Sequence, residues 1–238
     1  MSAQRHTFPD AQSAAEACAR RVAALLEAVL EAGNLASFAV SGGNTPRILF
    51  ERLAPLRLDW NRVHLFWVDE RSVPPTDPAS NYKLTKDWLL SAVHIPERNV
   101  HRILGEIAPK EAAHLYTEEI RRYFGLDPGE MPRFDVLECG IGPDAHTASL
   151  FPGEPLIDDR EGIAAAVFAP QFNQWRVTLL PGPLLAARHV LYLVSGADKA
   201  EAVRAVFHGP REPKTYPAQL AGLGAEWFLD EAAAGLLE

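Results

Sequence analysis

An aspartate and a histidine two residues apart, Asp144 and His146, are the side chains in this sequence whose types and spacing most clearly suggest chemistry. Histidine titrates near neutral pH, and a neighbouring carboxylate can orient its ring, so the pair could act as a general base. The alternative interpretation is that both side chains only form hydrogen bonds within a turn. We favour the base, because a glycine-rich approach precedes the pair and two further phosphate-type motifs occur elsewhere in the chain.

The element that must position this pair is a mostly apolar segment from Phe134 to Cys139, which reads as a buried strand ending at Gly140. We expect Thr147 to cap a short helix that begins at Ala148. Open α/β sheets bind ligands beyond the carboxyl ends of their strands. A strand that delivers the pair there places a titratable base in the binding crevice.

A second motif, SGGNTP at residues 41–46, lies between an expected short strand and an expected helix. Thr45 is expected at the N-cap and Pro46 at the first helical position. Free backbone N–H groups and the positive end of the helix dipole would favour an anion in the turn. The expected contacts are Gly42, Gly43, Asn44 and Thr45. The motif matches neither a dinucleotide nor a Walker fingerprint, so it suggests a single phosphate, although a turn that merely needs glycine explains it equally well.

Charged residues follow two other expected strands. A carboxylate pair and an arginine, Asp69, Glu70 and Arg71, come directly after the apolar segment 63–68. Their position suggests function, and a surface ion pair is the alternative. Arg176 is expected at the start of a strand over 176–179. Lys199 is expected in the first turn of a helix capped by Asp198. A lysine there opposes the helix dipole, which a bound phosphate would explain, and a solvated lysine is the alternative.

The composition excludes several classes of protein. The 238 residues are 47% hydrophobic and suit a single domain over 1–238. A formal charge of −8 argues against recruitment to nucleic acid or an anionic membrane. Two cysteines, no export signal and no long apolar run lead us to expect a reduced, cytoplasmic setting with no membrane contact.

Strands alternate with helices along the whole chain. Strands are expected over 38–40, 63–68, 134–139, 162–168, 176–179, 190–194 and 226–229. Helices are expected over 10–33, 47–53, 82–90, 109–123, 183–188 and 199–207. This alternation predicts a three-layer α/β/α sandwich around a mainly parallel, Rossmann-like sheet.

Other residue types give weaker signals. His64, His94, His101 and His114 are scattered without paired spacing, so we interpret them as structural or exposed and predict no metal site. Cys139 is interpreted as a small buried residue that ends its strand.

Taken together, the motifs resemble the glucosamine-6-phosphate deaminase/6-phosphogluconolactonase family. The matching stretches, in order, are SGGNTP, DERSVPPTDPASN, GIGPDAHTASLFPG, RVTLLPGPLLAAR and SGADKAEAV. One departure from the family pattern is Ala145, where the family usually has Gly between the Asp and the His. If that position requires a positive φ, alanine would be strained by roughly 1 kcal/mol.

The resemblance implies hydrolysis of 6-phospho-D-glucono-1,5-lactone without a metal or organic cofactor, by a monomer or weak homodimer. It implies that His146 is the general base and that Asp144 orients it or the water. The implied contacts to the phosphate and lactone oxygens are Arg71, the backbone N–H groups of Gly42 to Thr45, Arg176 and Lys199. Asp69 is a further expected substrate-binding residue. Arg71 could stabilise the oxyanion, while Arg176 and Lys199 could bind the distant phosphate.

Two other functions share parts of this pattern. An amino-sugar phosphate deaminase or isomerase usually carries a glutamate shortly after the histidine, where this chain has Thr147 to Phe151 without a carboxylate. A non-catalytic sugar-phosphate sensor is commonly fused to a DNA-binding segment, and this acidic chain shows no such stretch. Both features favour the lactonase.

Overall fold

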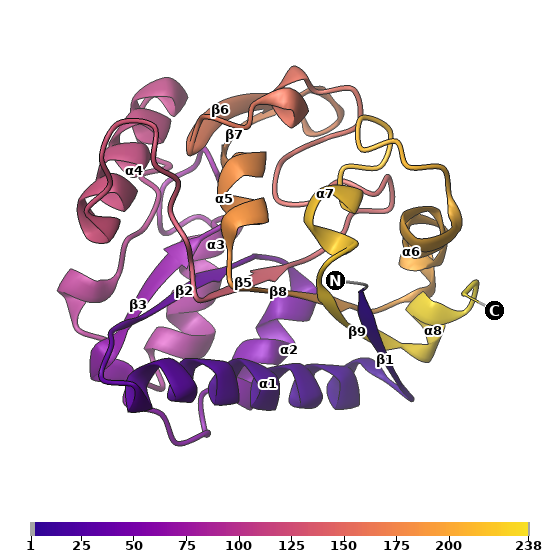
Figure 1. Ribbon diagram of the computed structural model, residues 1–238, viewed down its shortest axis with the longest axis horizontal. Helices are drawn as coiled ribbons and strands as arrows, with labels where there is room; N and C mark the ends of the chain where they lie inside the picture. The colour runs from indigo at the N-terminus through magenta and orange to yellow at the C-terminus, as the bar shows by residue number, and fades with distance from the viewer. Residues whose placement is uncertain (1–2, 238) are drawn as a thin grey trace.

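A six-stranded parallel sheet forms the centre of the computed structural model, which describes residues 3–237 (Figure 1). Its strands run in the order β1–β9–β8–β5–β2–β3, and every neighbouring pair is parallel. The bounds are β1 Gln4–Phe8, β2 Ala36–Val40, β3 Val63–Trp67, β5 Val136–Cys139, β8 His189–Val194 and β9 Glu226–Asp230. The predicted parallel sheet is therefore confirmed, and β1 is an edge strand that the sequence did not reveal.

A second, three-stranded antiparallel sheet was not predicted. It consists of β4 (Asp69–Arg71), β7 (Gln174–Leu179) and β6 (Ala164–Ala169), in the order β4–β7–β6. Val68 joins the two sheets, because its N–H donates to Val40 of β2 and its carbonyl accepts from Leu179 of β7. The chain thus leaves the large sheet at the end of β3, and Asp69 and Arg71 enter the small one.

The helices lie on both faces of the large sheet. They are α1 Ala11–Glu31, α2 Asn44–Leu53, α3 Asn81–Thr85, α4 Pro109–Phe124, α5 Pro181–Ala186, α6 Ala200–His208, α7 Gln219–Gly222 and α8 Glu231–Ala234. Helices α1 and α2 cover one face, and α5, α7 and the small sheet lie on the other (Figure 1). The sandwich has its three layers, but the small sheet shares one of them with helices.

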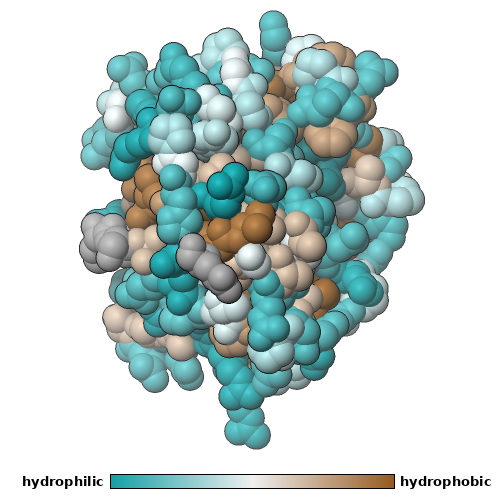
Figure 2. All heavy atoms as spheres, turned by 90° about the vertical axis from the view of Figure 1, so that its right-hand side faces the viewer, coloured by the Kyte–Doolittle hydropathy of each residue, from teal (hydrophilic) through white to brown (hydrophobic). Residues whose placement is uncertain are grey.

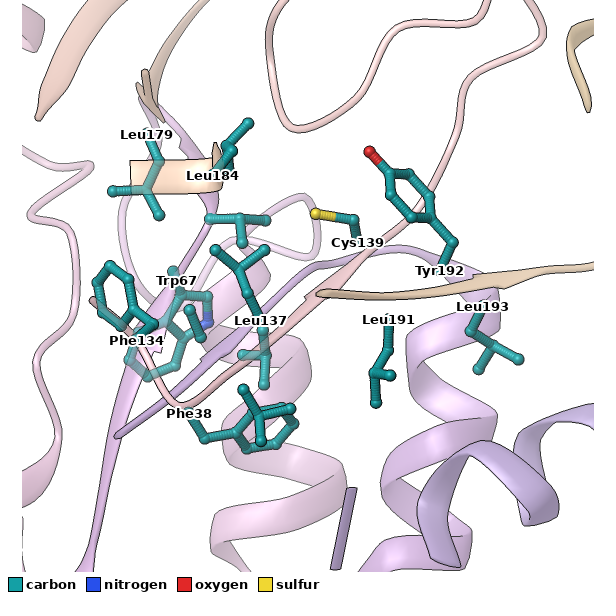
Figure 3. Packing of buried hydrophobic residues seen from close by; sticks show 14 of the residues in the cluster. Phe38, Trp67, Phe134, Leu137, Cys139, Leu179, Leu184, Leu191, Tyr192 and Leu193 are labelled. Atoms are coloured by element: carbon teal, nitrogen blue, oxygen red, sulfur yellow. The ribbon is translucent and has the colours of Figure 1, made fainter. Parts of the chain in front are cut away.

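The strands of the large sheet are buried on both faces, as a parallel sheet between two layers requires. Every residue of β2 is buried. Aromatic side chains fill the space around the strands, among them Phe38, Trp67, Phe134 and Tyr192 (Figure 3). The thiol of Cys139 points into this core, and burial raises its pKa, so the interpretation of Cys139 as a buried structural residue is confirmed.

The edge of the large sheet at β1 faces solvent. Its residues Gln4, Arg5 and Thr7 are exposed. This side of the molecule is mainly hydrophilic, with an apolar area near the centre of the view (Figure 2). Polar and charged side chains on an edge strand discourage pairing with other chains. No helix among residues 3–237 is long and apolar enough to cross a membrane.

Two of the scattered histidines, His64 and His101, lie next to each other in the fold, in the structural role that the sequence suggested. The Nδ1 atom of His64 lies 2.8 Å from Nε2 of His101, and Nδ1 of His101 lies 2.7 Å from Oε1 of Glu119. His101 also stacks on Phe66, so this hydrogen-bonded row packs into the core beside β3. A sequence separation of 37 residues hid the pairing.

Candidate active site

A cavity of about 380 Å³ lies at the carboxyl ends of β2 and β8. The SGGNTP turn forms one wall, with Gly42, Gly43, Asn44 and Thr45, and Lys199 lies on the opposite wall. The turn leads directly into α2, whose N-cap is Gly43 with φ +113°, a conformation that side-chain-bearing residues rarely adopt. No side chain of the described residues caps this helix, so its first N–H groups can serve an anion.

Thr45 does not cap α2, contrary to expectation, because the helix already begins at Asn44. Its Oγ1 lies instead 3.0 Å from Oγ of Ser195, which joins the two walls of the cavity. The prediction that Asp198 caps the following helix is also wrong. A short 3₁₀ turn precedes α6, Lys199 takes the N-cap position, and Asp198 pairs with the Lys199 ammonium at 3.0 Å.

A second cavity of about 110 Å³ adjoins the first, and the two share Gly42, Gly140 and Ile141 as lining residues. His146 lines this cavity together with three charged residues, Asp69, Arg71 and Arg176. The structure therefore brings the anion turn and the histidine to adjacent spaces. Arg176 and Lys199, both expected to bind the distant phosphate, lie at different cavities. Lys199 lines the first cavity and Arg176 the second.

Asp144 fixes the orientation of the His146 ring. Its Oδ1 lies 2.5 Å from Nδ1 of His146 and also accepts the backbone N–H of His146 at 3.2 Å. Partial burial acts to raise the pKa of Asp144, but its hydrogen bond and charge interaction with His146 outweigh this and lower it. An ionised Asp144 keeps the proton of the neutral ring on Nδ1, which leaves Nε2 as the basic nitrogen.

Glycine is required at position 142 because the His146 ring lies against it. A Cβ placed on Gly142 would lie 2.0 Å from Nδ1 of His146 and 2.6 Å from Oδ1 of Asp144. The turn is closed by the Gly142 N–H, which donates to the His146 carbonyl at 2.9 Å. The ring edge of His146 also contacts Phe151, with 4.7 Å between ring centroids.

The backbone at position 145 has a positive φ, the conformation for which the family's usual glycine is suited and alanine is not. Ala145 is buried and has φ +64°. A single alanine in this region costs roughly 1 kcal/mol or more, and the hydrogen bonds of the turn must offset it. Its N–H donates to Gly142 and its carbonyl accepts from Ala218, both at 2.9 Å, so the loop is held on two sides.

The helix expected at Ala148 is absent among the described residues. The segment forms turns, with Ala148 itself at φ +50°. Thr147 does not cap, because its hydroxyl donates to the carbonyl of Gly140 at 3.0 Å. Ser149 donates to Asp69, 2.5 Å from its Oδ2. This segment thus ties the histidine loop back to β5 and to the small sheet.

Two arginines, Arg71 and Arg176, line the second cavity from neighbouring strands of the small sheet. Arg71 and Arg176 are register partners on β4 and β7, so Arg176 lies inside its strand and not at its start as expected. Asp69 lies 3.7 Å from Arg176 and is the carboxylate that lines this cavity.

The Nε atoms of both arginines are buried without a hydrogen-bond partner among the described residues. Burial lowers the pKa of Arg176 despite the attraction of Asp69.

The carboxylate of Glu70, whose position after the strand suggested function, has a structural role and holds Arg71 in place. It accepts hydrogen bonds from the backbone N–H groups of Arg71, Asn81 and Tyr82, each at 2.7 Å, and from the Ser80 hydroxyl at 2.9 Å. Asn81 accepts in turn from the Arg71 guanidinium. Glu70 therefore closes the proline-rich loop onto the start of α3 and fixes the base of the Arg71 side chain.

We expect Glu70→Gln to lower the free energy of unfolding by about 2–3 kcal/mol, because the amide nitrogen cannot accept and leaves buried donors unpaired. Urea unfolding of the purified protein measures this change. Asp87→Asn, which removes an exposed carboxylate paired with Lys83, is the matched control and should change stability by less than about 0.5 kcal/mol. Equal stability of the two variants would refute the role given to Glu70.

Comparisons with known proteins agree with this geometry. Residues 9–228 match the family described as glucosamine-6-phosphate isomerases/6-phosphogluconolactonase. The chain is 36% identical to the 6-phosphogluconolactonase of Synechocystis sp., covering 88% of this chain and 87% of the relative. It is 38% identical to the human 6-phosphogluconolactonase, covering 97% and 92%. The solved 6-phosphogluconolactonase from Trypanosoma cruzi superposes with a TM-score of 0.86 at 26% identity, covering 100% and 98%. The chain therefore belongs to the glucosamine-6-phosphate isomerase/6-phosphogluconolactonase family.

Proposed function

We propose that this chain hydrolyses 6-phospho-D-glucono-1,5-lactone to 6-phospho-D-gluconate in the oxidative pentose phosphate pathway, with His146 as the general base. The observation that carries the proposal is the continuity of two cavities, one with an anion turn and the other with a carboxylate-oriented histidine. A phosphorylated lactone needs both at once. The substrate class of the relatives supports the same reaction.

In the first step, Nε2 of His146 accepts a proton from a water molecule as the water oxygen attacks the lactone carbonyl carbon. The proton on Nδ1 stays with the hydrogen bond to Asp144, whose negative charge stabilises the imidazolium that forms. In the second step, the tetrahedral intermediate collapses and the bond to the ring oxygen breaks. The imidazolium returns its proton to that oxygen, which leaves a hydroxyl group and a carboxylic acid that ionises.

Arg71 and Arg176 are proposed to stabilise the oxyanion of the intermediate. Both residues line the second cavity together with His146, so their guanidinium groups place positive charge beside the base. The Arg176 guanidinium lies 4.8 Å from the ring centroid of Phe172 and 5.6 Å from that of Phe151. These rings shield the charge from water, which strengthens its interaction with a developing negative charge. Asp69 keeps Arg176 in place from the other side.

The phosphate is proposed to bind at the first cavity, between the N-terminus of α2 and the Lys199 ammonium. Binding energy gained there holds the distant carbonyl next to His146. Asp198, which pairs with Lys199 in the structure, is mostly exposed, so the pair is weak and a phosphate can replace it.

Lys199→Met is expected to raise KM about tenfold to a hundredfold with little change in kcat, because one charge-assisted hydrogen bond to phosphate is lost. Steady-state kinetics with the phosphorylated lactone measures both constants. The matched control is Lys214→Met, which removes an exposed lysine paired with Asp158 and should leave both constants unchanged. A fall in kcat at constant KM would instead place Lys199 at the reacting carbonyl.

The function is tested by offering the purified protein three compounds. We expect strong acceleration of hydrolysis for 6-phosphogluconolactone, weak acceleration for gluconolactone without phosphate, and no ammonia release from glucosamine 6-phosphate. Ammonia release would support the deaminase alternative. Binding of phosphosugars without any turnover would support a sensor.

We also propose a reducing, cytoplasmic setting, because both cysteines are free and buried.

A further inference from the structure

Glu138, in β5, carries a fully buried carboxyl group that the proposed mechanism does not use. Its Oε2 accepts the backbone N–H of Ser41 at 2.9 Å, and the Ser41 hydroxyl donates to the Glu138 carbonyl at 2.9 Å. Its Oε1 is buried and has no hydrogen-bond partner among the described residues. Ser41 is thus fastened to residue 138 at two points, while half of the carboxyl group stays unsatisfied.

Ser41 is the residue on which the phosphate turn depends. It follows the last residue of β2 and precedes Gly42, and it lines the second cavity. The position of its N–H sets where the chain leaves β2 and enters the turn. Glu138 therefore fixes the entry to the turn formed by Gly42 to Thr45.

The groups around Glu138 offer it no positive charge. Asp69 acts on it from β4, and the thiols of Cys18 on α1 and of Cys139, its neighbour in β5, are the other titratable groups that interact with it. No salt bridge to Glu138 forms within residues 3–237. Burial raises the pKa of Glu138 to about 7, with the Ser41 hydrogen bond opposing this rise and Asp69 adding to it. A change in the charge near Glu138 can therefore change its protonation state.

We propose that Glu138 is a positioning residue for the phosphate turn and that it takes up a proton when a phosphorylated ligand binds. The inference rests on the proposed function in one respect, the assignment of the turn as the phosphate site. The Glu138 carboxyl group lies behind the turn, separated from it by Ser41, and lines neither cavity. A phosphate dianion bound at the turn repels a negative charge there, because the buried surroundings screen the interaction weakly. The neutral acid removes that repulsion and keeps an oxygen that accepts from Ser41.

Ligand binding and proton binding at Glu138 are expected to favour each other. The bound anion raises the pKa of Glu138 further, so the complex holds more protons than the free protein around pH 7. Affinity must then fall as pH rises through the free-protein pKa. With that pKa near 7, the loss between pH 6 and pH 8 reaches at most about tenfold, and uptake at pH 7 at most about half a proton.

The test is isothermal titration calorimetry with 6-phosphogluconate at pH 6, 7 and 8, in two buffers of different ionisation enthalpy. Proton uptake is compared between the wild type and Glu138→Gln, which keeps an acceptor for Ser41 but cannot titrate. The two proteins differ only at residue 138 and bind the same ligand, so the difference in proton uptake isolates Glu138. Glu130→Gln, an exposed glutamate on the surface, is the matched control and should behave as the wild type.

We expect Glu138→Gln to bind the ligand without the proton uptake that Glu138 contributes in the wild type. Its affinity should also depend less on pH than that of the wild type. Glu138→Leu, which also removes the acceptor, should bind several-fold more weakly than Glu138→Gln at every pH. Equal proton uptake in the wild type and Glu138→Gln would overturn the inference, as would wild-type affinity in Glu138→Leu. If the wild type binds 6-phosphogluconate with proton uptake but does not hydrolyse the lactone, only the proposed function is overturned. No binding by the wild type would overturn the phosphate site and this inference together.

Discussion

Replacing His146 by Gln is expected to lower kcat by about three orders of magnitude, the middle of the range for loss of a general base. KM and the affinity for 6-phosphogluconate should change by less than about threefold, because the phosphate turn and Lys199 are untouched. Glutamine preserves a polar side chain of similar length, but it cannot accept a proton from water. Steady-state kinetics and equilibrium binding together separate these two effects.

A control for this variant is available in the chain. His94 is exposed and lies outside both cavities, so His94→Gln should retain full activity. Asp144→Asn should lie between the two, because it leaves the ring in place but no longer fixes the proton on Nδ1. Retention of kcat by His146→Gln with normal folding would show that another group activates the water.

Gly142→Ala is expected to reduce kcat by about a hundredfold, since a displacement of about 1 Å in a catalytic group has an effect of this size. The added Cβ would lie 2.0 Å from Nδ1 and 2.1 Å from Cε1 of His146, so the ring must move away from Asp144. The methyl group itself brings no charge and removes no catalytic atom. Loss of activity would therefore report the position of the hydrogen-bonded pair of His146 and Asp144.

Pro143→Ala provides the comparison for Gly142→Ala, because Pro143 is the exposed neighbour in the same loop. It should leave kcat within about twofold, and circular dichroism should show both variants folded. The histidine NMR signals of Gly142→Ala should shift relative to the wild type, whereas those of Pro143→Ala should not. Full activity of Gly142→Ala would contradict the tight packing of the loop around His146.

The parallel sheet could be predicted because its strands are continuous apolar runs that alternate with amphipathic helices. The small antiparallel sheet could not. Its strand β4 has only three residues, Asp69 to Arg71, and they are all charged. Pairing with β7 outweighs their low strand propensity, and that pairing joins segments about a hundred residues apart.

Local spacing was informative for the site but incomplete. Asp144 and His146 do form a hydrogen-bonded pair, as two residues in one turn can. The roles of Glu70 and Glu138 depend on neighbours that only the fold supplies, so their burial was not visible in the sequence. The helix expected after Thr147 does not form. The Thr147 hydroxyl donates to the carbonyl of Gly140, which precedes it, and does not cap a helix that follows it.

The central claim, that an anion turn and an oriented histidine form one site for a phosphorylated lactone, is tested most directly by the rate of lactone disappearance. The substrate is generated in place from glucose 6-phosphate, and its spontaneous hydrolysis is subtracted. We predict a large acceleration by the wild type that is almost entirely lost in His146→Gln measured in parallel. A wild-type rate no faster than the spontaneous reaction would contradict the claim.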